Sequence, residues 1–121
     1  MSEDLLKEQN PHSIEAEQAV LGSMLIDEQC IPGVIEILDS TDFYSETNRD
    51  IFSAIHSMFN SSEEINPVIV QDKMRADGVW NENTANYIKD LLMMTPTSAN
   101  VIEYAHIVKD KSLLRNQSWF R

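Results

Sequence analysis

Residues 13–25 of the chain read SIEAEQAVLGSML, and this stretch decides which class of fold to expect. Ser13 is a favourable helix N-cap, and Glu15 and Glu17 stand in the first turn, where the helix dipole favours acidic side chains. The apolar side chains that follow recur every three or four residues, as one buried face of a helix requires. The stretch therefore predicts a helix that packs its apolar side against other elements.

The rest of the chain continues as helical segments separated by short polar breaks. Apolar spacing and capping residues predict five further helices, over about 28–38, 45–59, 67–78, 83–93 and 99 onwards. Pro32 interrupts the first of these, and Gly78 is placed to end the third. Strand-like alternation of apolar and polar residues appears nowhere over a useful length. We therefore expect an all-α domain, a compact bundle of about six helices with a projecting C-terminal helix.

The segment 45–59 has the clearest amphipathic pattern and is expected to supply the centre of the core. Phe52 and Ile55 fall in the middle of its apolar face. Just before it, Phe43 and Tyr44 are expected to fill the gap between two helices. The side chains predicted to form the core are Val20, Leu21, Phe43, Phe52, Ile55 and Tyr104.

The last helix changes its apolar face part of the way along. Val101, Tyr104, Ala105 and Val108 form one stripe that can close the core, but Leu113 lies roughly 140° around the helix from Val108. Little chain remains to cover the apolar residues that follow. They belong either to a frayed terminus or to a helix that projects towards a partner. On the second reading, the candidate partner interface consists of Leu113, Leu114, Trp119 and Phe120.

The net charge of −11 is unevenly distributed. Residues 1–64 carry fourteen acidic side chains against Lys7 and Arg49, whereas residues 65–121 are nearly balanced. Duplex DNA repels such an acidic surface, because binding requires basic side chains to replace phosphate counterions. We therefore expect no direct tight DNA binding. The acidity itself serves either solubility or a basic protein partner.

Composition also predicts where the chain works. No apolar run approaches the length of a membrane span. We expect residues 1–12 to be a flexible tail; they are acidic and lack the features of a secretory signal. The single cysteine, Cys30, excludes an internal disulfide and fits a reducing compartment. We expect a cytoplasmic protein with no membrane association.

The residues for familiar enzyme chemistry are missing from this segment. Its three glycines cannot form a G-x-x-x-x-G-K-[ST] phosphate loop. Glu103 and His106 make one E-x-x-H pair, but a di-iron site needs a second copy and further carboxylates. No nucleophile stands with a recognisable base. We expect no catalytic, cofactor-binding or metal-binding residues here.

Three blocks carry a resemblance to a known family: PHSIEAEQAVLGSMLID, then DFYSETNRDIF, then TPTSANVIEYAHIVKDKSLLR. Together, in this order and spacing, they closely resemble the amino-terminal domain of the bacterial replicative DNA helicase, the DnaB family. The resemblance runs from about residue 11 to 115. At Asn48 the family often has histidine, a difference expected to affect only local capping.

The resemblance implies a role in an assembly. Helicases of this family are hexameric rings that unwind DNA with ATP and Mg²⁺, which are bound by a separate motor domain of RecA-like fold. Their amino-terminal part is a helical head followed by a helical hairpin, and it forms a collar that docks primase. By this resemblance, 13–108 is the head and 109–121 the start of the hairpin or linker helix. The expected partners are other helicase subunits, in a homodimer or hexameric collar, primase and a helicase loader.

A rival reading keeps the same fold. The chain would then be a stand-alone decoy or regulator that resembles the helicase head and binds the helicase or primase of a host. A reading frame that continues past Arg121 into a G-x-x-x-x-G-K-[ST] loop would favour the helicase.

Overall fold

The computed structural model describes residues 11–118, and the side chains of residues 11–116. Within this range the chain forms six α-helices and no strand, which confirms the all-α prediction. The helices are α2 (Ile14–Ile26), α3 (Ile31–Ile37), α4 (Glu46–Asn60), α5 (Pro67–Ala76), α6 (Glu82–Met94) and α7 (Val101–Ser118). Two short 3-10 turns precede α3 and α4: η1 (Glu28–Cys30) and η2 (Ser40–Asp42).

The capping residues read from the sequence begin and end these helices as expected. Ser13, Ser45 and Asn66 each accept backbone N–H groups in the first turn of α2, α4 and α5. Gly78 follows α5 with a φ of 79°, a conformation in which glycine avoids steric cost. Gly78 N–H donates to Arg75 and Val79 N–H to Met74, which completes a Schellman motif.

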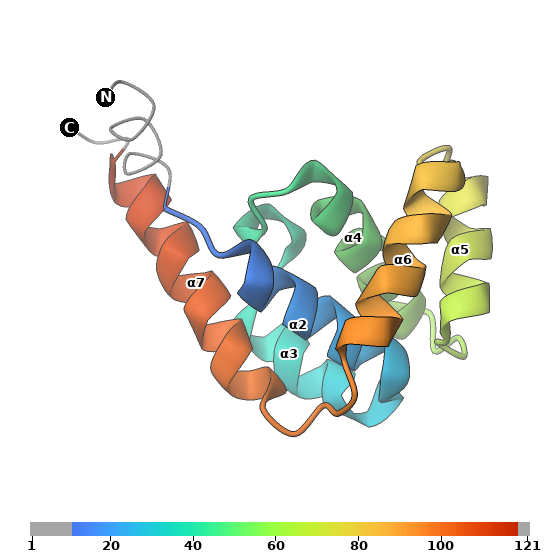
Figure 1. The fold of residues 1–121 in the computed structure, drawn as a ribbon, viewed down its shortest axis with the longest axis horizontal. Coiled ribbons are helices and arrows are strands. Elements are labelled where there is room, and N and C mark those ends of the chain that lie inside the picture. The colour runs from blue at the N-terminus through green and yellow to red at the C-terminus, as the bar shows by residue number, and fades with distance from the viewer. Residues whose placement is uncertain (1–10, 119–121) are drawn as a thin grey trace.

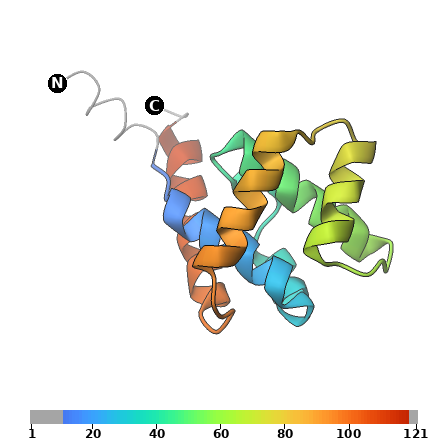
Figure 2. The same cartoon turned by 45° about the vertical axis from the view of Figure 1, so that its right-hand side comes forward.

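Helix α2 lies in the middle of the bundle, as Figure 1 shows, and it packs against α4, α6 and α7. Helix α5 packs on α4 at one end of the molecule, and α7 runs along the other end. Turning the molecule by 45° keeps α7 beside the start of α2 (Figure 2). Helix α7 packs against α2 and α3, and it runs without a break across the proposed boundary between residues 108 and 109.

The core forms where the helices cross. Val20, Leu21, Phe43, Phe52 and Ile55 are at most 1 % exposed, and the Phe43 and Phe52 rings lie 4.9 Å apart. Two expectations need correction. Tyr104 is only half-buried at the edge of the core, because the buried face of α7 passes through Val101, Ala105 and Val108. Tyr44 is 41 % exposed and stacks on His12 instead of filling a gap.

Candidate interaction surface

Helix α7 exposes aliphatic side chains on the two flanks of its outer side. Its buried side consists of Val101, Ala105, Val108 and Ser112. Away from that side, Ile102, Ile107, Leu113 and Leu114 keep 39–48 % of their area exposed. At about 100° per residue these side chains fall into two pairs, Ile102 with Leu113 and Ile107 with Leu114, which lie roughly 120° apart around the helix. Exposed polar residues, among them Glu103 and Asp110, separate the two pairs.

The structure places two of the four predicted interface residues on this surface. Leu113 and Leu114 are 48 % and 46 % exposed, whereas Trp119 and Phe120 lie outside the described residues. Sequence reasoning missed Ile102 and Ile107, because it looked only beyond Val108. The signal was present: Ile107 and Leu114 are seven residues apart, the spacing at which apolar side chains share one face of paired helices.

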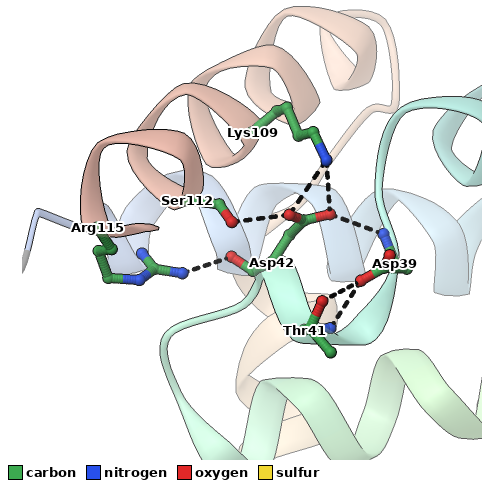
Figure 3. Close-up of polar contacts among 6 residues, drawn as sticks. All are labelled: Asp39, Thr41, Asp42, Lys109, Ser112 and Arg115. Atoms are coloured by element: carbon green, nitrogen blue, oxygen red, sulfur yellow. Dashed lines mark hydrogen bonds and ion pairs between the residues drawn. The ribbon is translucent and has the colours of Figure 1, made fainter. Parts of the chain in front are cut away.

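A polar cluster around Asp42 holds the second half of α7 against the head (Figure 3). Ser112 Oγ donates to Asp42 Oδ1 at 2.7 Å, and Lys109 Nζ lies 3.3 Å and 3.4 Å from the two carboxylate oxygens. The backbone N–H of Asp39 donates to Asp42 Oδ2 at 2.9 Å. Asp42 is 5 % exposed, so the charge is buried but fully bonded. No motif in the sequence pointed to this cluster.

The same end of α7 also holds the segment that leads into α2. Arg115 donates to the carbonyl oxygens of Asp42 and Pro11, both at 2.8 Å. Its guanidinium lies 5.5 Å from the centre of the Tyr44 ring, which in turn stacks on His12 at 3.9 Å. The start and the end of the described chain therefore meet at one place, as Figure 1 also shows.

A second polar network joins α2, α4 and α6. Glu17 is 1 % exposed and accepts the backbone N–H of Tyr44 and the side-chain amide of Asn48, at 2.8 Å and 2.9 Å. Asn48 in turn accepts the hydroxyl of Tyr87 at 2.6 Å. Burial raises the pKa of Tyr87, against the hydrogen bonds that it makes. Asn48 therefore does more than affect local capping, because its side chain links three helices.

A shallow cavity of about 480 Å³ lies beside this network, at the starts of α2, α4 and α6. Its lining carries hydroxyl and amide groups and no ionisable side chain other than Tyr87. Such a lining can offer hydrogen bonds, but it has no carboxylate, imidazole or amine for acid–base work. Across residues 11–118, no group of three His, Cys, Asp or Glu side chains is arranged to hold a metal ion. In the same range, no helix is long and apolar enough to cross a membrane.

The family follows from a sequence comparison. The profile of the DnaB-like helicase N terminal domain matches residues 9–110. The chain belongs to this family. This match confirms the resemblance that the three sequence blocks indicated, and it covers most of the chain.

Known proteins of this kind are similar over the same range. The replicative DNA helicase DnaB of Leifsonia xyli is 35 % identical over 106 residues, which cover 87 % of this chain and 23 % of the relative. That of Geobacillus stearothermophilus is 38 % identical over 116 residues, covering 95 % of this chain and 26 % of the relative. The chain thus spans about a quarter of the length of these curated relatives.

Solved structures share the DnaB-like fold. The N-terminal domain of DnaB helicase from Mycobacterium tuberculosis matches with a TM-score of 0.82 at 34 % identity, over 88 % of this chain and 76 % of that one. The corresponding domain from Helicobacter pylori matches with a TM-score of 0.74 over 98 % of this chain and 89 % of that one. At 21 % identity the second match shows the fold alone.

Proposed function

We propose that this chain is the N-terminal protein-interaction domain of a replicative DNA helicase, and that it contributes to collar assembly and primase coupling. The observation that carries the proposal is the family match over residues 9–110. We take primase as the partner class because the solved domain from Helicobacter pylori, which has the same fold, is described together with its interactions with primase.

The exposed face of α7 suits contact with another subunit. Ile107 and Leu114 offer apolar area to a neighbour on one flank of α7 and Leu113 does so on the other, and we assign Trp119 and Phe120 to the same interface. Burial of apolar surface contributes about 25 cal/mol per Å² before the costs of association. Exposed ion pairs contribute only about 0–1 kcal/mol each. Apolar contact should therefore dominate pairing between subunits.

In this role the domain works in the cytoplasm and leaves the motor chemistry to another domain. ATP and Mg²⁺ would bind to the motor, and a helicase loader would be a further partner of the assembly. The domain would neither bind nor hydrolyse ATP by itself, since its three glycines form no phosphate loop. Calorimetric titration with ATP tests this point, and micromolar binding would contradict it.

Primase binding is tested with the 121-residue chain and the primase encoded by the same genome. Surface-immobilised chain should capture primase with a dissociation constant in the micromolar range or tighter, and a heat-unfolded sample of the chain should not. No capture at primase concentrations up to about 100 µM, which corresponds to a binding free energy of roughly −5.5 kcal/mol, would contradict the coupling role.

Self-association tests the α7 face separately. We expect weak association at most, which Ile107→Asp should abolish because it places a charge in an apolar contact. Val68→Asp is the matched control, since Val68 is 69 % exposed on α5, and α5 lies at the opposite end of the molecule from α7 (Figure 1). Sedimentation velocity over a concentration series gives the result. A tight dimer that survives Ile107→Asp would place the interface elsewhere.

A further inference from the structure

The way α7 packs on the head changes along the helix. Over its first half, Val101, Ala105 and Val108 enter the core at 5 % exposure or less. Between residues 109 and 116, the only buried side chain is that of Ser112, and it is polar. The second half of the helix is therefore attached to the head by polar contacts, although it belongs to the same continuous helix.

These contacts converge on a single carboxylate, which the head itself holds in place. Asp42 closes a capping box at η2, in which its side chain accepts the N–H of Asp39. The carboxylate then has its remaining acceptor positions directed at Ser112 and Lys109 of α7 (Figure 3). Arg115 adds a bond to the backbone carbonyl of the same residue. We call Asp42, Lys109, Ser112 and Arg115 the α7 latch.

Polar and apolar contacts constrain a helix differently. Apolar burial is non-directional, so a helix held by it alone can slide or tilt on its neighbour. A hydrogen bond requires both a short distance and a narrow angle, so several bonds to one fixed carboxylate define a direction. Asp42 and Ser112 are buried, but when α7 tilts away their hydrogen bonds can be exchanged for bonds to water without exposing the apolar core. The latch thus fixes α7 in one orientation and can open while the head stays folded.

We propose that the α7 latch sets the direction in which the last turns of α7 leave the head, with Asp42 as its positioning residue. The latch is also the joint at which that direction can change. Arg115 bonds Pro11 as well, so the opening of the latch loosens the segment that leads into α2 at the same time. The proposal rests on these contacts alone and does not depend on the proposed partners of the domain.

The test measures distances within the whole 121-residue chain, with Cys30 replaced by serine. Spin labels are placed at Glu46 on α4 and at Asn116 near the end of α7, both exposed. In a second sample the two spin labels are placed at Glu46 and at Glu103, which is exposed in the first half of α7. With the latch closed, both pairs should give one narrow distance distribution.

Two variants open the latch from opposite sides. Asp42→Asn removes the charge and one acceptor, and Ser112→Ala removes only the buried donor on α7. In both, the distribution between positions 46 and 116 should broaden or split, while that between 46 and 103 stays unchanged. Amide exchange over residues 109–116 should accelerate by about tenfold or more, with residues 101–108 unaffected. Lys109→Gln should give a smaller effect in the same direction.

The controls are Lys111→Gln and Asp90→Asn. The first removes a positive charge from the same stretch of α7 outside the latch, and the second neutralises an exposed carboxylate on α6. Both should leave the distances and the exchange rates unchanged.

Unaltered distances in Ser112→Ala would overturn the proposal. Equal changes in the distance distributions of both label pairs would overturn it too. The latch would then hold the whole of α7 on the head, and would not set the direction of its last turns alone. If Asp42→Asn fails to fold, the outcome is decided by Ser112→Ala, which leaves Asp42 bonded to Asp39 and Lys109.

Discussion

Phe52 stands at the centre of the core, where its side chain has no exposed surface and meets the ring of Phe43. Phe52→Ala should lower the free energy of unfolding by about 3–5 kcal/mol, through lost burial and the cavity left behind. That is a large part of the roughly 5–15 kcal/mol that holds a small domain folded. Urea unfolding followed by circular dichroism measures the loss.

Phe59 provides a matched control on the same helix. It is 37 % exposed near the end of α4, so Phe59→Ala should cost about 1 kcal/mol or less. A loss below about 1 kcal/mol for Phe52→Ala, or equal losses for the two variants, would show that Phe52 does not anchor the core.

Cys30 should be a slow-reacting thiol. Burial, together with the negative charge of Asp27, raises the pKa of Cys30 from 9.0 to about 11. The thiolate is the reactive form, so at pH 8 the folded chain should react with a disulfide reagent at least about tenfold more slowly than the unfolded chain. The reaction is followed by absorbance, with and without urea. Similar rates in the two conditions would contradict the raised pKa.

The same shift has a consequence for stability. Since the folded pKa lies above the unfolded one, the neutral thiol is favoured in the fold. The free energy by which the neutral Cys30 thiol stabilises the folded state is fully present below pH 9 and is lost as the pH rises towards 11. The Cys30→Ala variant should therefore lose less stability than the parent chain between these two pH values.

At the scale of the element, α2 lies close to the loop between α6 and α7. A Cβ on Gly22 would lie 2.8 Å from the Cβ of Thr95 and still closer to its hydroxyl oxygen. Gly22→Ala should therefore destabilise the fold by about 1–3 kcal/mol, although alanine alone would favour the helix by about 1 kcal/mol. Thermal and urea melts would show the difference.

Gly33 is the control for this prediction because it is also helical and close to a side chain. There the nearest atom to a new Cβ is the flexible tip of Ile102, at 3.3 Å. Gly33→Ala should change stability by less than about 0.5 kcal/mol or increase it. If Gly22→Ala were equally harmless, α2 and the loop would have to be further apart than the structure shows.

At the scale of the whole molecule, the charge of −11 governs encounters with nucleic acid. We expect the chain to bind a fluorescent single-stranded oligonucleotide with a dissociation constant above about 100 µM at 0.15 M salt. The reason is that few Lys and Arg side chains are available to replace the counterions of the phosphates. Fluorescence anisotropy measures the binding, with a basic single-strand-binding protein as a positive control. A tight, salt-sensitive complex would contradict the expectation.

Much of the fold follows from the sequence alone, since its determinants are local. Helix starts at Ser13, Ser45 and Asn66 and the stop at Gly78 depend on residues within one turn of each other. The apolar spacing of 45–59 likewise identified Phe52 and Ile55 without knowledge of what covers them. The family could be recognised for the same reason, because its blocks consist largely of such packing and capping residues.

Only the tertiary structure decided how polar residues distant in the chain meet. Asp42 and Ser112 are 70 positions apart, and Glu17 and Asn48 are 31 apart. In the sequence each of these four residues looks like an ordinary surface residue. The spacing of apolar residues shows which face of a helix is buried, but it does not show which other element packs against that face. The close crossing of η2 and α7 removes water from Asp42 and leaves Ser112, Lys109 and Asp39 to bond it. The sequence by itself thus determined the helices and their buried faces, and their packing determined the contacts that direct α7.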